Sequence, residues 1–317
     1  MKVLLINIDS KIPNIALMKL STYYKSNGDE VGFNVTDPDI VYASIVFEKN
    51  KHKADGLKFL YPDAKIVIGG SGYNYAVRLP DEIELLKPDY TLYSDCDYSI
   101  GFSTRGCFRN CSFCIVPQKE GKFQKVQHPE EWYNPEFKKI VFLDNNILAD
   151  KSWFLEVSEW CIQKKLSVWF TQGLDIRLVN QVVAKKLLEL KFFKGLFFAW
   201  DHIEDESVIK EKIQLLKDVG FTDSKLKQFV QFYIYTDTDA DYESGVYRCR
   251  ELKKLSCNAF VMFNVRNTPT KRIRQLQRWA NRKALFWSKD ISEYARSRRD
   301  RRELEAVNSR VAAGAIL

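Results

Sequence analysis

The chain has 317 residues, of which 45% are hydrophobic and 14% aromatic, a composition that excludes a disordered protein. It contains no run of about 18 uncharged apolar residues, so the sequence predicts no membrane span. The net charge of +8 is uneven, because residues 271–302 carry twelve Lys and Arg against three Asp and Glu. At the N-terminus, MKVLLINIDS has no small-residue cleavage site, and we predict a buried strand there rather than a signal peptide.

The first 95 residues alternate apolar strands with helical patterns. Residues 2–8 predict a buried strand, and residues 14–28 predict a helix that ends at Gly28. Further stretches rich in Val and Ile predict three more strands. Such alternation predicts a parallel sheet covered by helices, and we place a Rossmann-type α/β domain at residues 1–95. The three later strands are predicted at 30–36, 39–47 and 64–70.

A second series of six strands follows, with amphipathic helices between most of them. Six β/α units predict a partial (β/α)6 barrel of the TIM type at residues 96–285, followed by a basic helical extension at 286–317. Functional residues of such sheets collect beyond the carboxyl ends of the strands. The strands are predicted at 98–104, 139–144, 167–172, 195–200, 228–236 and 258–265, and the helices at 152–165, 179–191, 204–218, 241–255 and 270–284.

Three cysteines follow the first strand of the predicted barrel. Cys107, Cys111 and Cys114 have the spacing C-x3-C-x2-C, with Arg105 and Arg109 beside them to offset negative charge. In a chain without an export signal this cluster favours a metal site over disulfides, so we expect a reducing compartment, the cytoplasm. Four-thiolate sites are closed, whereas three thiolates on a cubane iron–sulfur cluster leave one iron open to a small molecule.

A zinc site is the alternative for these cysteines. His128 follows the third cysteine by fourteen residues and would serve as the fourth ligand. Structural zinc usually replaces a missing core in a small fold, however, and a chain of this length can bury a core of its own. We therefore favour the cluster.

The sequence CFRNCSFC, with Phe113 directly before the third cysteine, resembles the signature of the radical S-adenosylmethionine (SAM) superfamily. The resemblance covers about residues 95–285 and includes the partial barrel. It implies a [4Fe–4S] cluster held by Cys107, Cys111 and Cys114, with the amino and carboxylate groups of SAM on the fourth iron. It also implies reductive cleavage of SAM to methionine and a 5′-deoxyadenosyl radical, which abstracts hydrogen from a substrate. The electron would come from a flavodoxin or ferredoxin type of donor.

Members of this superfamily place polar residues after the second strand to hold the SAM amino group. Here the sequence FLDNNILAD offers Asp144, Asn145 and Asn146 in place of the usual Gly-Gly-Glu pattern. A carboxylate that faces an ammonium group favours Asp144. The alternative is a group of residues that caps the next helix, for which Asp150 and Ser152 compete.

Polar residues also follow the third and fourth strands. Gln172, Asp175 and Arg177 are candidates for contacts with ribose hydroxyls and the SAM carboxylate, or the last two form only a loop salt bridge. Asp201 and His202 are the catalytic candidates, since they would face substrate or ribose and a histidine can move protons near pH 7. The alternative for this pair is a capping aspartate beside a surface histidine.

The remaining cysteines argue against a second cluster. Cys96, Cys161, Cys249 and Cys257 form no C-x2-C pair, and we expect each to be a small buried hydrophobic residue. RNA methylthiotransferases of the same superfamily carry three further cysteines in their N-terminal domain. Residues 1–95 contain none, which disfavours that subclass.

Residues 1–90 resemble the cobalamin-binding type of domain that precedes the barrel in one branch of the superfamily, through VLLIN and IVIGGSG. Members that bind cobalamin through histidine have D-x-H-x-x-G after the first strand, where this chain has NIDSKIPNI. The sequence NKHKADG at 50–56 follows a later strand. We therefore do not expect a histidine ligand to cobalamin. We favour loss of the cofactor over cobalamin bound without a protein ligand.

Residues 271–303 interleave Arg and Lys with Trp279, Phe286, Trp287 and Tyr294. Cationic residues with exposed aromatics suit the backbone and the bases of a nucleic acid. The alternative is a solvated helix face in which Trp279 points to the barrel and the arginines point to water.

These features predict a radical SAM enzyme whose substrate is unidentified, with a nucleic acid or nucleotide as the leading candidate. A cobalamin-dependent radical SAM methyltransferase is the enzymatic alternative. A nucleic-acid-binding protein with a structural metal is the non-enzymatic alternative. The sequence leaves the oligomeric state open.

Overall fold

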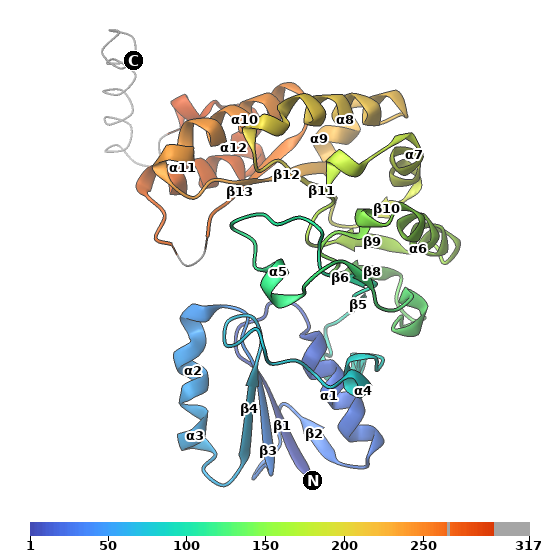
Figure 1. Ribbon diagram of the computed structural model, residues 1–317, viewed down its shortest axis with the longest axis vertical. Helices are drawn as coiled ribbons and strands as arrows, with labels where there is room; N and C mark the ends of the chain where they lie inside the picture. Colours follow the sequence, from blue (N-terminus) through green and yellow to red (C-terminus); the bar gives the residue numbers. More distant parts are fainter. Residues whose placement is uncertain (265–266, 295–317) are drawn as a thin grey trace. The chain divides into compact units, whose positions relative to one another are not determined.

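The structure, a computed structural model, describes residues 1–264 and 267–294 (Figure 1). The chain divides into two compact units. The first comprises residues 1–172 with 189–194, and the second comprises 173–188 with the described residues from 195 onward. Both units contain parallel strands and helices, so the predicted α/β class is confirmed. The domain boundaries predicted at 95 and 285 stay predictions.

The first unit begins with a fully parallel sheet in the order β2-β1-β3-β4 (Figure 1). Val3 and Leu5 of β1 pack against the first helix, and Leu4 lies in a separate cluster with Val41. The strands are therefore buried on both faces, as expected when helices cover both sides. The elements are β1 (Lys2–Asn7), α1 (Ile15–Ser26), β2 (Glu30–Gly32), β3 (Ile40–Ser44), α2 (Lys51–Asp55), α3 (Leu57–Leu60), β4 (Lys65–Gly69) and α4 (Asp81–Glu84).

A second parallel sheet in the same unit has the order β10-β9-β8-β5. Met18 of α1 packs with Ile100 of β5 and Val141 of β8 in one buried cluster. The hydroxyl of Tyr90 accepts the N–H of Ile100 at 3.1 Å, so the N-terminal segment is anchored directly to β5. The elements are β5 (Ser99–Gly101), β8 (Lys139–Phe142), α6 (Lys151–Gln163), β9 (Ser167–Phe170) and β10 (Lys191–Phe192).

The second unit contains a parallel sheet in the order β11-β12-β13 together with most of the remaining helices (Figure 1). Alternate residues of β12 are fully buried, since Val230, Phe232 and Ile234 have no exposed surface. Its elements are α7 (Gln181–Glu189), β11 (Leu196–Ala199), α8 (Glu206–Asp218), α9 (Asp223–Phe229), β12 (Val230–Tyr235), α10 (Tyr242–Lys254), β13 (Asn258–Met262), α11 (Lys271–Ala280) and α12 (Lys283–Ser288).

All six strands predicted for the barrel are present, but their hydrogen bonds group them into two separate sheets. In the second unit, Leu174 forms a parallel bridge to Phe198 of β11, and its N–H donates to the carbonyl of Phe197 at 2.8 Å. A single partial TIM barrel that contains all six strands stays a prediction. No helix in the described part of the chain is both long enough and apolar enough to cross a membrane.

Candidate functional site

The three clustered cysteines lie on one loop whose ends are tied together. β6 (Thr104–Arg105) and β7 (Gln124–Lys125) form an antiparallel pair at its base. The N–H of Cys107 donates to the carbonyl of Gly121 at 3.3 Å. Gly106 has a φ of 72°, and a Cβ there would collide with the opposite side of the loop. Glycine is therefore required at the point where the cysteine loop closes.

Backbone N–H groups are directed at two of the three sulfurs. The N–H of Arg109 lies 3.3 Å from Sγ of Cys107, and the N–H of Val116 lies 3.4 Å from Sγ of Cys114. The N–H of Cys114 donates to the carbonyl of Cys111 at 3.0 Å, which places both cysteines in one turn. Hydrogen bonds to sulfur favour the thiolate form and help proteins to tune bound iron–sulfur clusters.

The loop cysteines differ in burial from three of the other four. All three are half-buried, whereas Cys161, Cys249 and Cys257 are fully buried. Burial raises the pKa of Cys249 and Cys257 to about 12, and it raises the pKa of Cys161 as well. The prediction of small buried residues is confirmed for these three. It is wrong for Cys96, which is half-buried and donates its thiol to the carbonyl of Tyr98 at 3.2 Å.

Arg105 fixes the base of the cysteine loop. Its guanidinium forms ion pairs with Glu84 of α4 and with Glu120, the latter at 2.7 Å, and lies 3.8 Å from the ring centroid of Phe102. Burial alone would raise the pKa of Glu120, but the positive charge of Arg105 outweighs burial and holds that pKa below its usual range. Arg105 is therefore paired with two carboxylates, and its offset of a cluster's charge stays a prediction.

Arg109 and the loop phenylalanines stay near the cysteines. The guanidinium of Arg109 lies 4.7 Å from the ring centroid of Phe108, an exposed side chain. Phe113 is half-buried between the second and third cysteines. Its role beside a cofactor stays a prediction.

Asp144, just beyond the carboxyl end of β8, is buried and surrounded by donors. It accepts the N–H and hydroxyl of Ser103 at 3.1 and 2.6 Å, and both groups of Thr104 at 2.6 Å. Burial raises the pKa of this carboxyl, and the four donors oppose that rise. Sequence reasoning missed Ser103 and Thr104, although a Ser-Thr pair after an apolar strand is a signal for such a contact. Asp144 thus ties β8 to the cysteine loop, and its contact with SAM stays a prediction.

Asn145 and Asn146 both face the cysteine loop. Oδ1 of Asn145 accepts the N–H of Gly106 at 3.0 Å, and Nδ2 of Asn146 lies 3.6 Å from Sγ of Cys107. Asn146 is only 4% exposed, and its Oδ1 is buried with no hydrogen-bond partner among the described residues. Such a buried acceptor costs about 1–3 kcal/mol. A bound group that donates a hydrogen bond to this oxygen would recover that free energy.

His128, the fourth ligand of the zinc alternative, has other partners. Its Nδ1 accepts the N–H of Glu130 at 3.3 Å, and its ring packs edge-on against Trp153 and Trp160. Within 1–264 and 267–294, no three His, Cys, Asp or Glu side chains converge on a position for one metal ion. A zinc ion needs its ligands within about 2.3 Å, whereas each thiolate of a cubane cluster binds a different iron. The three thiols share one loop, with N–H donors at two sulfurs, and their binding of a cubane cluster stays a prediction.

In the second unit, Asp175 and Arg177 form the loop salt bridge that was one of the two interpretations. Nε of Arg177 lies 2.7 Å from Oδ1 of Asp175, and its Nη1 lies 2.8 Å from Oδ2 of Asp205. The first unit contains Gln172, an exposed residue whose amide donates to Thr171 at 3.3 Å. Contacts of these residues with SAM stay predictions.

Asp201 and His202 follow β11. Asp201 accepts the N–H of Tyr235 at 3.1 Å, and burial raises its pKa, while His202 is exposed. Sequence reasoning missed Arg248 of α10, which is 2% exposed and donates to the carbonyls of Trp200, Asp201 and Tyr235. Its position on the apolar face of α10 was the available signal. These contacts favour a structural role for Asp201, and catalysis by this pair stays a prediction.

The carboxyl edge of the N-terminal sheet is closed by its own loops. Asp9, after β1, accepts the N–H groups of Val46 and Phe47 at 2.7 and 3.0 Å and the amide of Asn50 at 2.9 Å. The N–H of Gly72 donates to the loop after β3 at 3.0 Å. Asp9 lies in the segment where a cobalamin-binding histidine would occur. It therefore holds neighbouring loops together.

The aromatic residues of the basic segment are packed inside the second unit. Trp279 and Phe286 are fully buried, and Tyr294 is 8% exposed. The indole N–H of Trp279 donates to a backbone carbonyl at 3.0 Å. The expectation of exposed aromatics is therefore wrong for these three, and the alternative with Trp279 facing the core is confirmed. Residues 295–303 of the basic segment, and 295–317 of the predicted helical extension, lie outside the described residues.

No family model matches the chain. It is 29% identical over 113 residues to the bacteriochlorophyllide d C-8(2)-methyltransferase of Chlorobaculum tepidum. The match covers 35% of this chain and 22% of the relative, so the chain aligns with less than a quarter of that enzyme. This similarity to an enzyme agrees with the expectation that the chain is itself an enzyme.

Proposed function

We propose that this chain is a radical SAM enzyme that holds a [4Fe–4S] cluster through Cys107, Cys111 and Cys114. When bound, the cluster and SAM supply a 5′-deoxyadenosyl radical that removes hydrogen from a substrate. The strongest support is the buried, unpartnered Oδ1 of Asn146, whose amide nitrogen lies 3.6 Å from the sulfur of Cys107. A cofactor ammonium beside the cysteines is the kind of donor that this oxygen lacks.

The residues of the loop have separate tasks in this proposal. The three thiolates bind three irons and leave the fourth iron for the amino and carboxylate groups of SAM. Oδ1 of Asn146 would accept a hydrogen bond from the SAM amino group and so help to hold that group beside the cysteines. Asp144 and Arg105 keep the loop closed through buried hydrogen bonds and ion pairs. Phe113 and the half-buried setting of the cysteines limit the access of water.

Methyl transfer is the second candidate function, because the relative found by comparison is a methyltransferase. A cobalamin-dependent methyltransferase would use a cofactor bound at the N-terminal sheet. The carboxyl edge of that sheet carries no histidine after β1, and Asp9 holds the loop there. We therefore place this function second. The non-enzymatic alternative, a structural zinc site, is weakened by the contacts of His128 with Glu130 and two tryptophans.

One preparation separates these functions. The chain is purified and reconstituted without oxygen, reduced, and incubated with SAM, and the products are analysed by chromatography. Radical SAM chemistry predicts a brown protein with about four irons per chain that forms 5′-deoxyadenosine and methionine. A colourless protein with one zinc ion and no 5′-deoxyadenosine would contradict the proposal. A corrin absorbance in the purified protein would instead favour methyl transfer.

A further inference from the structure

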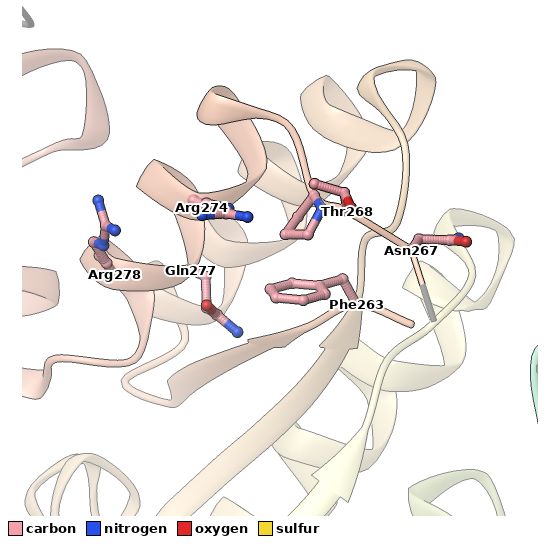
Figure 2. Close-up of a pocket in the computed structure, with 7 residues that line it drawn as sticks. Phe263, Asn267, Thr268, Arg274, Gln277 and Arg278 are labelled. Carbon is pink, nitrogen blue, oxygen red and sulfur yellow. The ribbon is translucent and has the colours of Figure 1, made fainter. Parts of the chain in front are cut away.

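A pocket of about 370 Å³ lies beside the carboxyl end of β13, within the second unit (Figure 2). Its size falls in the range of small-molecule sites, about 300–1,000 Å³. Two arginines contribute to its lining, and no Asp or Glu in the described part of the chain does. The lining residues are Phe263, Asn267, Thr268, Pro269, Arg274, Gln277 and Arg278.

Among the described residues, the two arginines have no acidic partner. Arg274 and Arg278 lie four residues apart on α11, and neither forms an ion pair with any described residue. Arg272, on the same helix, pairs with Glu243 at 2.7 Å. Like charges four residues apart destabilise a helix, and an anion shared between them would reverse that effect. Guanidinium groups that line a pocket are suited to phosphate oxygens.

The opposite wall of the pocket can receive a planar group. Figure 2 shows the ring of half-buried Phe263 directed toward Gln277, with Arg274 above them on α11. Aromatic rings stack on nucleic-acid bases of any sequence. The amide of Asn267 is held by Asp237 at 2.5 Å, and that carboxylate does not line the pocket. Two arginines and an aromatic ring therefore line one pocket.

We propose that this pocket binds one nucleotide unit, with its phosphate on Arg274 and Arg278 and its base against Phe263. SAM is not the ligand expected here, because its sulfonium and ammonium groups make it a cation that two arginines repel. The proposal names the substrate class of the enzyme and to that extent rests on the proposed function. Nucleotide binding needs neither reduction nor SAM, so the nucleotide site and the proposed radical SAM function can fail independently of each other.

The test measures binding to the full-length, iron-loaded chain without reductant. The probes are a fluorescent single-stranded RNA of about ten nucleotides, adenosine 5′-monophosphate and adenosine. We expect R274Q/R278Q to bind the RNA at least about tenfold more weakly. The slope of log K against log salt should become less steep by about 0.7, since one phosphate contact on a single strand contributes about 0.7. F263L should weaken binding about tenfold through lost stacking.

R272Q is the matched control, because it removes the same charge from the same helix outside the pocket. Its affinity should stay within about twofold of wild type. Competition by adenosine 5′-monophosphate but not adenosine would support the proposal with a free nucleotide as the source. RNA binding that both compounds fail to compete, yet that R274Q/R278Q weakens, would support it with a nucleic acid as the source.

Three outcomes would overturn the proposal. One is the absence of binding of every probe to the folded wild-type chain. Another is equal weakening by R272Q and by R274Q/R278Q, which would indicate diffuse charge rather than a site. The third is that R274Q/R278Q binds RNA as wild type does but its cluster is reduced more slowly by a flavodoxin. That result would indicate that the arginines bind an acidic electron-donor protein. The thermal midpoint of each variant checks that it is folded.

Discussion

The side-chain nitrogen of Asn146 lies 3.6 Å from the sulfur of Cys107, although the two residues are 39 positions apart in the chain. One belongs to the segment after β8 and the other to the cysteine loop. The oxygen of the same amide is buried without a partner among the described residues. The contact places an unsatisfied acceptor beside a thiol, at the position where the proposed cofactor would present its ammonium group.

Removal of this acceptor is expected to weaken SAM binding. N146A should raise the dissociation constant of SAM about tenfold or more, because a hydrogen bond to a charged group contributes about 1.5–3 kcal/mol. Equilibrium dialysis with the reconstituted protein measures the constant. N134A is the control, since the oxygen of Asn134 already accepts the N–H of Glu136 at 3.2 Å. Equal SAM affinity in N146A and wild type would remove Asn146 from the site.

The iron content should depend on the loop cysteines alone. C111A should lose most of its iron, because two thiolates hold a cubane poorly. C96A should keep about four irons per chain, since the half-buried Cys96 lies outside the loop and hydrogen-bonds to Tyr98. Iron and sulfide assays on both variants decide the matter. Full iron content in C111A would show that this cysteine is not a ligand.

The ion pairs at the base of the loop should stabilise the first unit. R105M leaves the buried Glu120 with only Lys119 as a cationic partner, at 3.3 Å, and should cost about 3 kcal/mol of unfolding free energy. Urea unfolding followed by circular dichroism measures this value. K139M is a matched control, because Lys139 pairs with Asp97 at the surface and such pairs contribute about 0–1 kcal/mol. Equal small losses in both variants would argue against a stabilising role for Arg105.

The same carboxylate predicts a pH dependence. The pKa of Glu120 in the folded protein is lowered from its ordinary value of 4.5. A lowered carboxyl pKa contributes stability above the unfolded pKa, and that contribution is lost as the pH falls through the folded pKa. Between about pH 5 and pH 3, wild-type unfolding free energy should therefore fall more steeply than that of E120Q. Parallel curves for the two proteins would contradict the assigned ion pair.

The positions of the longer strands along the chain were predictable, because each is a short apolar run followed by polar residues. Local signals also placed α1, which begins after Asn14 and ends before Gly28, where φ is 78°. Two-residue elements were missed. β10 and the β6–β7 pair owe their pairing to distant partners, and nothing in their own composition marks them as strands.

Tertiary contacts set the surroundings of side chains that the sequence alone does not reveal. Asp144 was chosen for its charge, and the hydroxyls of Ser103 and Thr104 surround it once β8 pairs with β5. Cations flank Trp279 and Phe286, so the sequence left open whether the aromatics contact a nucleic acid or Trp279 faces the core. A helix places its aromatic and its cationic side chains on opposite faces, and the apolar face is buried. The grouping of Cys107, Cys111 and Cys114 could be predicted without tertiary contacts, since the three residues share one short loop.

Electron paramagnetic resonance of the reduced, iron-loaded protein, recorded with and without SAM, tests the central claim most directly. A cluster with three cysteine ligands has one iron on which SAM can bind. The account predicts a [4Fe–4S] signal whose g values shift when SAM is added, and the shift should be smaller in N146A at the same SAM concentration. A cluster signal that saturating SAM leaves unchanged would show that the fourth iron is closed, and it would contradict the account.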